Sequence, residues 1–330
     1  MKILVIRFSS MGDIIYTTPV VRCLKKQLSG AEVHFLTKSA FKYIYDNNPY
    51  VDKVILLKET LFETIKDIKA EKYDYIIDLH NNIRTRLIKL NAHVKSSTYK
   101  KQSIRKWLSL KFNIKLVEPI HLVDRYMKAV DFLGVRNDNK PIDYYIKAEH
   151  DLKKLLPPSH QNGYITFVIG ATHFTKRMPN QKISSICREL NKPVVLLGGN
   201  DVKANGDEVA SNDENIYNAC GITSLDESVF LVSKANGVIG FDTGLTHIAE
   251  AFNIPIVSVW GGTAPELLGV QPYQVKEVLV SGIELPCRPC SKFGLAACPL
   301  GHFKCMIDMP EKPIIDFANQ HNKIKSRMTS

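Results

Sequence analysis

Short apolar runs rich in β-branched residues alternate with amphipathic stretches along almost the whole chain. The runs lie at residues 2–8, 32–37, 53–57 and 73–79 in the first half, and at residues 164–169, 193–197, 216–217, 237–241 and 254–260 in the second. Runs of this kind are typical of buried strands, and their alternation with helices is typical of parallel, doubly wound sheets. We therefore predict an α/β chain with two Rossmann-like domains.

A polar, proline-containing segment at residues 134–163 separates the two sets of strands. A chain of 330 residues also exceeds the usual size of one domain. We predict one domain over residues 1–155, a second over residues 156–312, and a helix followed by a basic tail over residues 313–330. Two such α/β halves predict a cleft between them.

The chain is basic, with a formal net charge of +11 and an isoelectric point near 9.2. This charge favours a polyanionic partner, but the basic residues are dispersed and lack the signatures of nucleic-acid readers, so we expect no nucleic acid. Neither a secretory signal nor a membrane-spanning run is evident, and the seven cysteines are an odd number, which argues against a disulfide framework. We expect a cytoplasmic protein with peripheral contact to the membrane.

The turn after the first predicted strand has the sequence Arg7-Phe-Ser-Ser-Met-Gly-Asp13. Because open α/β sheets bind ligands at the carboxyl ends of their strands, Asp13 is a candidate site residue. Pro19 limits the helix that follows to a short first segment. An aspartate at the start of a helix also serves as an N-cap, and the sequence leaves both roles open.

Two loops of the second half are candidate anion sites. Residues 170–179 follow a predicted strand and carry hydroxyls and Lys176, but they lack the glycine spacing of a phosphate loop, so a solvated loop is an equal alternative. Residues 240–249 run through a glycine turn into a helix, whose first N–H groups suit a pyrophosphate. Here the alternative is a capped helix with His247 as a structural histidine. Two such loops in one domain favour nucleotide binding.

Four cysteines near the C-terminus, Cys287, Cys290, Cys298 and Cys305, follow the pattern C-x2-C-x7-C-x6-C. The first pair has the spacing of a zinc site. The pattern contains only one such pair, however, and buried cysteine is a common small apolar residue. We therefore assign no metal site and keep a zinc cluster as the alternative.

Together these motifs resemble the ADP-heptose:lipopolysaccharide heptosyltransferases of glycosyltransferase family 9. The resemblance rests on Arg7-x-Ser-x-Met-Gly-Asp13, on Lys176-Arg177-x-Pro179, and on Asp242-Thr-Gly-Leu-Thr-His247 continuing to Trp260-Gly-Gly262. It implies the GT-B fold, with two Rossmann-like domains facing each other across a cleft. The N-terminal domain would bind the acceptor, the C-terminal domain would bind the nucleotide sugar, and the last helix would cross back to the first domain.

The resemblance also implies a reaction, the inverting transfer of heptose from ADP-heptose to a lipopolysaccharide inner-core acceptor of the Kdo/heptose-lipid A type. Asp13 would be the general base and Lys176 the cation that meets the leaving diphosphate, with no metal or other cofactor required. The donor-binding residues would be Thr172, Asp201, Asp242, Thr243, Gly244, Leu245, Thr246 and His247. The acceptor-binding residues would be Ser10, Gly12, Asn81, Arg84 and Arg86, of which the last three equally fit a solvated basic face.

Three other functions stay open. One is a family member that uses another nucleotide sugar for another surface glycan, since phosphate loops do not specify the sugar. Another is a catalytically silent protein that binds nucleotide sugars, although the chain retains both Asp13 and Lys176. A nicotinamide dehydrogenase is disfavoured because neither half has a G-x-G-x-x-G turn after its first strand.

Overall fold

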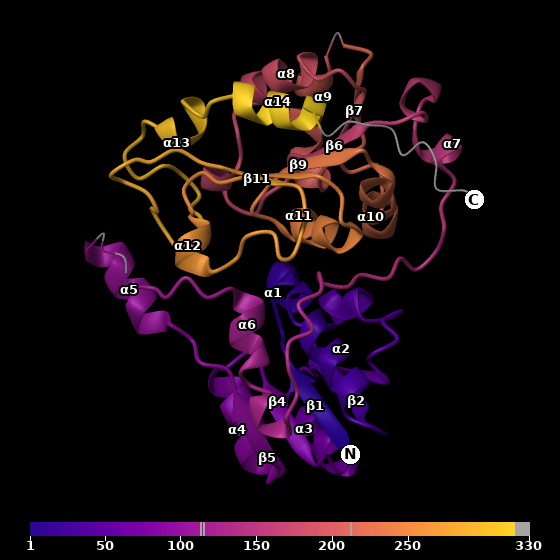
Figure 1. Cartoon of the computed structure of the whole chain (residues 1–330), viewed down its shortest axis with the longest axis vertical. Coiled ribbons are helices and arrows are strands. Elements are labelled where there is room, and N and C mark those ends of the chain that lie inside the picture. The colour runs from indigo at the N-terminus through magenta and orange to yellow at the C-terminus, as the bar shows by residue number, and fades with distance from the viewer. Residues whose placement is uncertain (113, 115, 212, 321–330) are drawn as a thin grey trace. The chain divides into compact units, whose positions relative to one another are not determined.

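The chain forms two compact units in a computed structural model that describes residues 1–112, 114, 116–211 and 213–320 (Figure 1). Unit 1 comprises Met1–Ser103 and Ile120–Lys147, and unit 2 comprises Ile104–Pro119 and Ala148–Ser330. The predicted boundary between residues 155 and 156 is therefore displaced toward the N-terminus. Residues 104–119, which the prediction assigned to the first domain, cluster with unit 2.

A buried arginine explains why the segment before residue 148 belongs to unit 1. Arg22 donates through Nε and Nη2 to the two carboxylate oxygens of Asp138, at 2.9 and 2.8 Å, and through Nη1 to the carbonyl of Pro141 at 2.9 Å. Asp143 forms a further ion pair with the same guanidinium. These contacts hold the segment against the helix that carries Arg22.

Unit 1 is built on a parallel sheet with the strand order β3-β2-β1-β4-β5. The strands are β1 (Lys2–Ile6), β2 (Glu32–Thr37), β3 (Lys53–Leu56), β4 (Tyr75–Asp78) and β5 (Lys95–Thr98). The first four confirm the predicted runs. The prediction missed β5 because this edge strand has the polar sequence Lys-Ser-Ser-Thr and no fully buried residue.

Most helices of unit 1 lie between consecutive strands of its sheet, and α6 follows the last strand, β5. They are α1 (Met11–Ile15), α2 (Thr18–Gln27), α3 (Leu61–Ala70), α4 (Ile83–Ala92) and α6 (Leu122–Met127), with the 3-10 turns η1 (Ser39–Ile44) and η2 (Asp131–Leu133). Pro19 lies in the first turn of α2, and α1 stays short, as predicted. Thr60 and Asn82 cap α3 and α4 by accepting hydrogen bonds from backbone N–H groups.

Unit 2 is built on a parallel sheet with the strand order β11-β10-β9-β6-β7-β8. The strands are β6 (Ile165–Val168), β7 (Val194–Leu197), β8 (Ile216–Asn218), β9 (Gly237–Phe241), β10 (Ile256–Val259) and β11 (Val278–Ser281). This is the order of a Rossmann sheet, and it confirms the predicted Rossmann-like fold of the second half. The prediction missed β11, which is again a partly exposed edge strand.

Helices cover both faces of this second sheet. Val194 and Leu196 face one apolar cluster, and Val195 and Leu197 face the other. Figure 1 shows α8, α9 and α14 on one side of the sheet and α10 and α11 on the other. The helices and turns of unit 2 are α5 (Ser103–Phe112, whose first residue belongs to unit 1), α7 (Leu152–Leu155), η3 (Pro158–His160), η4 (Phe174–Lys176), α8 (Asn180–Arg188), η5 (Asn200–Val202), α9 (Lys203–Ala210), α10 (Leu225–Lys234), α11 (Gly244–Ala249), η6 (Glu250–Phe252), α12 (Pro265–Leu268), α13 (Lys304–Ile307) and α14 (Lys312–Gln320).

The C-terminal helix differs from the prediction. Ile314, Ile315 and Ala318 of α14 pack into the core of unit 2, in the cluster that also contains strand residues of β6 and β9. The apolar face of the helix is thus used within unit 2, and its described part does not cross to unit 1. The predicted basic tail at residues 321–330 lies outside the described residues. Within the described chain, no helix is long and apolar enough to cross a membrane.

Candidate active site

The turn between β1 and α1 holds an arginine–aspartate pair. Arg7 Nη2 lies 2.5 Å from Asp13 Oδ2, and the same guanidinium donates through Nε to Ser9 O and through Nη1 to Leu79 O, both at 2.7 Å. Arg7 is buried, whereas the Asp13 side chain is 30% exposed. The arginine therefore ties this turn to the end of β4 and orients a carboxylate that solvent still reaches.

Asp13 is also the residue that closes the first turn of α1. Its Oδ2 accepts hydrogen bonds from the backbone N–H of Ser10 at 3.2 Å and from Ser10 Oγ at 2.9 Å. Burial opposes ionisation of Asp13, but the charge of Arg7 and the Ser10 hydrogen bonds outweigh it and lower the pKa of Asp13. Asp13 is thus both a capping residue and an accessible, ionised carboxylate, while Gly12 lies half-buried beside it in α1.

Aromatic groups from other elements surround this pair, and the sequence analysis did not identify them. The Tyr126 ring of α6 lies 5.8 Å from Arg7 Cζ and 4.8 Å from the Tyr99 ring. The His80 ring lies 4.9 Å from the Phe8 ring, and burial together with the charge of Arg7 lowers the pKa of His80 to about 4. His80 is therefore neutral at neutral pH. These residues come from separate segments, so no local motif marks them.

The predicted acceptor-binding residues after β4 divide into two kinds. Asn81 has a positive φ of 51° and turns the chain into α4; its Nδ2 donates to Tyr99 O at 3.1 Å, so its side chain supports the turn. Arg84 and Arg86 are exposed on α4, which agrees both with acceptor binding and with a solvated basic face. Being two residues apart on a helix, they point in different directions. The turns that carry Asp13 and Asn81 are neighbours because β1 pairs with β4.

A row of four alternating charges runs through three segments of unit 2. Lys176 Nζ, from η4, donates to Asp242 Oδ2 at 2.5 Å and to Asp242 O at 3.1 Å. Asp242 follows β9, and its Oδ1 lies 3.2 Å from His247 Nε2 of α11. His247 Nδ1 lies 3.0 Å from Oε1 of the fully buried Glu250. Lys176 was predicted as a catalytic residue and Asp242 and His247 as donor-binding residues, and the structure brings these three into one row of contacts.

The ionisation states in this row follow from its contacts. Burial alone would raise the pKa of Asp242, but the His247 hydrogen bond and the Lys176 charge lower it to about 2. Burial alone would lower the pKa of His247, but hydrogen bonds to Asp242 and Glu250 raise it to about 9. His247 is therefore an imidazolium at neutral pH and donates from both ring nitrogens. His247 is thus a hydrogen-bonded structural histidine and also a member of the candidate site.

Glu250 is the member of the row that the sequence analysis missed. It lies three residues after His247, a spacing that brings side chains together on a helix, so the signal was present in the sequence. Its Oε2 accepts a hydrogen bond from the backbone N–H of Tyr273 at 2.9 Å. Thr263 Oγ1 also donates to Asp242, at 3.5 Å.

The remaining predicted donor residues lie around this row. Thr243, Gly244, Leu245 and Thr246 form the turn from β9 into α11, where Thr243 Oγ1 lies 3.3 Å from Thr246 Oγ1. Thr172 is exposed on the loop between β6 and η4. Asp201, in η5 after β7, instead pairs with Arg177, whose Nη2 lies 2.6 Å from Asp201 Oδ2. The loops after β6, β7 and β9 therefore meet at the carboxyl ends of the central strands.

A partly buried arginine and a tight glycine turn support the loop that carries Lys176. Arg288 donates through Nε to Gly261 O at 2.5 Å and through Nη2 to Thr263 O at 3.0 Å. Gly262 N in turn donates to Thr175 O at 2.9 Å. No local pattern in the sequence marks Arg288 for this role, because its contacts join segments more than twenty residues apart.

The cysteine-rich segment packs beside this support. Cys290 N donates to Gly262 O at 2.8 Å, and Cys290 Sγ donates to Cys287 O at 3.2 Å. Cys287 Sγ lies 3.8 Å from His302 Nε2. In the described part of the chain, no group of three or more His, Cys, Asp or Glu side chains is placed to hold a metal ion. Cys298 and Cys305 are near the apolar core of unit 2, and Cys305 is buried in it.

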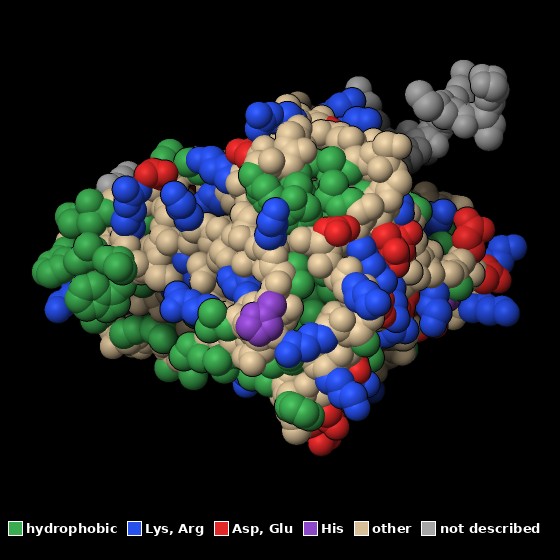
Figure 2. Space-filling view, turned by 90° about the horizontal axis from the view of Figure 1, so that it is seen from below, with side chains coloured by type: hydrophobic (Ala, Val, Ile, Leu, Met, Phe, Trp, Pro, Cys, Tyr) green, Lys and Arg blue, Asp and Glu red, His purple; other side chains and the backbone are tan. Residues whose placement is uncertain are grey.

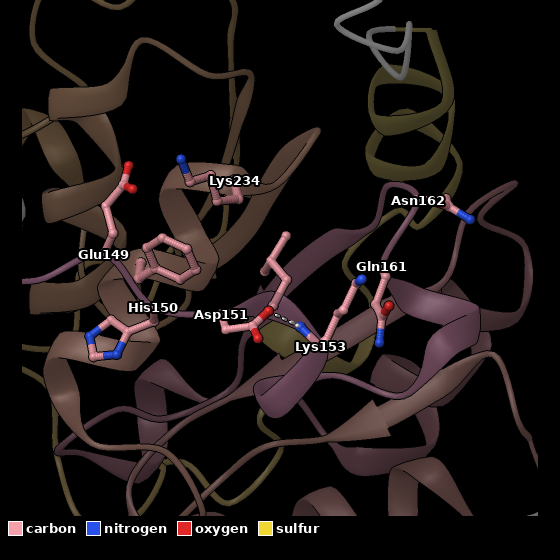
Figure 3. Close-up of a pocket in the computed structure, with 9 residues that line it drawn as sticks. Glu149, His150, Asp151, Lys153, Gln161, Asn162 and Lys234 are labelled. Carbon is pink, nitrogen blue, oxygen red and sulfur yellow. Dashed lines mark hydrogen bonds between the residues drawn. The ribbon is translucent and has the colours of Figure 1, made fainter.

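A separate hollow of about 420 Å³ in unit 2 contains none of the predicted site residues. Its lining comes from the linker, the start of α7 and α10: Glu149, His150, Asp151, Leu152, Lys153, Gln161, Asn162, Phe230 and Lys234. Figure 3 shows that the labelled side chains point in different directions instead of converging. His150 Nε2 is already paired with Asp226 Oδ2 at 2.8 Å. We do not assign the active site to this hollow.

Two parallel Rossmann-like sheets in one chain, each with charged residues at the carboxyl ends of its central strands, are the architecture of the GT-B fold, and similar solved structures of glycosyltransferases support this class. A structure titled as glycosyl transferase family 9 from Veillonella parvula DSM 2008 has a TM-score of 0.78 at 21% identity, over 97% of this chain and 96% of that one. A structure of E. coli heptosyltransferase WaaC with ADP-2-deoxy-2-fluoro heptose has a TM-score of 0.69 at 18% identity, over 97% and 99% of the two chains.

Sequence comparison gives the family. Residues 61–298 match glycosyltransferase family 9 (heptosyltransferase). Lipopolysaccharide heptosyltransferase 1 of Campylobacter coli is 24% identical over 294 residues, which cover 80% of this chain and 84% of that protein. The chain belongs to glycosyltransferase family 9 and is a glycosyltransferase, as the resemblance of its motifs implied.

Proposed function

We propose that this enzyme transfers heptose from ADP-heptose to a lipopolysaccharide inner-core acceptor of the Kdo/heptose-lipid A type, with inversion at the anomeric carbon. The observation that carries the proposal is the Arg7–Asp13 pair, which places an ionised, accessible carboxylate at the end of the central strand β1. The name of the Campylobacter coli relative supports a lipopolysaccharide acceptor, and the ADP-heptose analogue in the WaaC structure supports this donor.

In the proposed reaction Asp13 removes the proton from the acceptor hydroxyl as its oxygen attacks the anomeric carbon. A new carbon–oxygen bond forms there, the bond to the diphosphate breaks on the opposite face, and ADP leaves with the bonding electrons. Arg7 keeps Asp13 ionised, because it lowers the pKa of the carboxyl. The acid limb of the activity should therefore lie below the ordinary pKa range of aspartate.

We propose that Lys176 and the turn from β9 into α11 receive the diphosphate. An ammonium group has three N–H donors, and the two contacts to Asp242 occupy two of them, which leaves one for a phosphate oxygen. Asp242 fixes the position of Lys176 but also offsets its charge. The first backbone N–H groups of α11 would then supply much of the anion binding. No metal ion is required in this scheme.

The acceptor side rests on residues of unit 1. Ser10 and Gly12 lie beside Asp13, and Arg84 and Arg86 offer exposed guanidinium groups for an acidic or phosphorylated sugar. Because such an acceptor is anchored by lipid, we propose that the enzyme works at the cytoplasmic face of the inner membrane.

The test uses purified protein, ADP-heptose and a deglycosylated lipopolysaccharide core in the presence of EDTA, with ADP release and acceptor mass as readouts. We expect turnover in EDTA, and we expect Asp13→Asn to lower kcat by about 10²- to 10⁴-fold while ADP still binds. Because Asp13 also caps α1, the matched control is Thr60→Ala. It removes the N-cap hydrogen bond of α3, at about 1 kcal/mol of stability, and should leave activity unchanged.

The outcomes separate the open alternatives. Binding of ADP-sugars without turnover would indicate a binding module or a different acceptor. Turnover of another nucleotide sugar in place of ADP-heptose would show that the donor is a different sugar, while the proposed inverting transfer would stand. Full activity of Asp13→Asn would exclude Asp13 as the base, and loss of activity in EDTA would show that a metal is needed.

A further inference from the structure

Helix α5 has its apolar side chains on the outside and its polar side chains underneath. Ile104, Trp107 and Phe112 are 76%, 56% and 57% exposed. On the opposite side of the helix, Lys106 is buried and its Nζ donates to Leu268 O of α12 at 3.0 Å. Ser109 is also buried, and its Oγ accepts a hydrogen bond from Leu116 N at 3.2 Å. A surface helix of a globular protein normally has the reverse arrangement.

The exposed apolar surface extends beyond the helix. Ile114 and Leu116, in the segment that follows, are also among the exposed large apolar side chains of the described chain. Figure 2 shows apolar side chains gathered at its left edge, the side on which α5 lies in Figure 1, with Lys and Arg side chains beside them. A contiguous exposed patch of this kind marks an interaction surface.

The charges on α5 itself are all positive, although Arg105 pairs with Glu118 of the segment that follows. Residues 100–112 contain five Lys or Arg and no Asp or Glu. Lys111 lies on the exposed side, where its Nζ is 4.9 Å from the centre of the Trp107 ring. A long lysine side chain in this position can lie along an apolar surface and extend its ammonium group to a polar boundary.

We propose that α5 docks on an anionic lipid bilayer, with Ile104, Trp107 and Phe112 entering the boundary between headgroups and acyl chains and Lys111 facing the headgroups. A helix that combines Trp, Phe and Ile with Lys and Arg and lacks acidic residues has the chemistry of an interfacial helix. The bond from buried Lys106 to Leu268 O attaches the helix to the rest of unit 2 in this orientation, and Ser109 ties it to the segment that follows. The inference does not depend on which sugar the enzyme transfers.

Charge favours the bilayer over a second copy of the chain. A two-fold contact through α5 would bring Lys111 of one copy toward Lys111 of the other, and α5 has no acidic residue to offset them. An anionic membrane attracts the same charges and also accepts the apolar side chains.

Tryptophan fluorescence gives a direct test, because the chain has two tryptophans and Trp260 is 1% exposed, so a change on lipid addition reports on Trp107. The full-length protein is mixed with vesicles of phosphatidylcholine alone or of phosphatidylcholine with phosphatidylglycerol, and emission and co-sedimentation are followed. We expect a blue shift and co-sedimentation with the anionic vesicles, both weakened by salt.

The variant Ile104→Ser/Phe112→Ser keeps Trp107 as the probe and should lower the partition coefficient at least about tenfold. The matched control Ile222→Ser/Phe62→Ser removes one exposed Ile and one exposed Phe elsewhere and should bind like the unmodified protein. Thermal unfolding of both variants checks that they fold. The proposal would be overturned if the protein did not bind anionic vesicles, or if both variants bound them equally. It would also be overturned if the emission of Trp107 shifted without lipid, in step with dimerisation of the protein measured by sedimentation.

Discussion

At His247 the contacts of a single side chain reverse the effect of burial. A buried histidine is normally neutral, as at His160, where burial lowers the pKa. His247 is buried as well, but it lies between the carboxylates of Asp242 and Glu250, and its pKa rises to about 9. The difference arises from the partners, since two nearby carboxylates stabilise the imidazolium by more than desolvation costs.

The stability of the folded protein should therefore decrease at alkaline pH. The folded-state pKa of His247 lies above the unfolded value, so its contribution is fully present below about pH 6.5 and is lost as pH rises through about 9. The loss should be at most about 3 kcal/mol. Urea unfolding between pH 6 and pH 10 measures it. His247→Gln should flatten this alkaline decline. The control His160→Gln changes a histidine whose pKa is lowered, and it should retain the decline. An unchanged decline in His247→Gln would contradict the raised pKa of His247.

At the scale of elements, the loop that carries Lys176 is positioned by the turn after β10. A Cβ atom on Gly261 would lie 2.6 Å from the backbone carbonyl of Thr175, and one on Gly262 would lie 3.0 Å from Thr175 Cβ. The two backbones approach so closely that only glycine fits without a shift. Because Thr175 precedes Lys176, any such shift moves the lysine relative to Asp242.

Gly261→Ala should consequently weaken ADP binding as well as stability. We expect a loss of about 1–3 kcal/mol in the free energy of unfolding, because the added methyl group overpacks the turn, and about a tenfold rise in the Kd for ADP. Calorimetric titration with ADP and urea unfolding measure the two effects. Gly237→Ala is the control, because a Cβ atom there meets its nearest neighbour at an ordinary 3.5 Å. A normal ADP affinity in Gly261→Ala would show that the turn does not position Lys176.

At the scale of the whole molecule, the candidate residues divide between two independently packed units. The Arg7–Asp13 pair and the arginines of α4 belong to unit 1, whereas the Lys176–Asp242 row belongs to unit 2. Each sheet supplies its own loops at the carboxyl ends of its central strands. Of the two binding steps, substitutions in unit 1 should therefore affect acceptor binding alone, and substitutions in unit 2 should affect donor binding alone.

Variants in the two units should accordingly change different kinetic constants. Arg84→Ala combined with Arg86→Ala should raise the KM for the acceptor and leave the Kd for ADP unchanged, since both residues lie in unit 1. Lys176→Ala should lower kcat by about 10²- to 10³-fold and weaken ADP binding. Its control is Lys182→Ala, which breaks a similarly shielded ion pair with Glu311, 3.0 Å long, in the same unit. Weakened ADP binding in the arginine variant would contradict this division of roles.

The particular residues show where prediction from the sequence succeeded. The Asp242–His247 motif and Lys176 were identified because each follows a strongly apolar strand, which marks the sheet edge where ligands bind. Glu250 was within reach of the same argument, by its helical spacing from His247. Arg288, Tyr99 and Tyr126 were not, because each reaches its site from a segment far along the chain and carries no local pattern.

The sequence by itself determined the two Rossmann-like sheets, their central strands and the loops that carry Asp13, Lys176 and Asp242, because burial on both faces forces a continuous apolar run onto a strand. Only the tertiary structure decided the edge strands β5 and β11, the unit boundary after Lys147, the packing of α14 within unit 2 and the outward apolar face of α5. Edge strands and surface helices are partly exposed, so their sequences are weakly constrained by burial. Their positions depend on contacts between distant segments, such as Arg22 with Asp138 and Lys106 with Leu268, which no local pattern encodes.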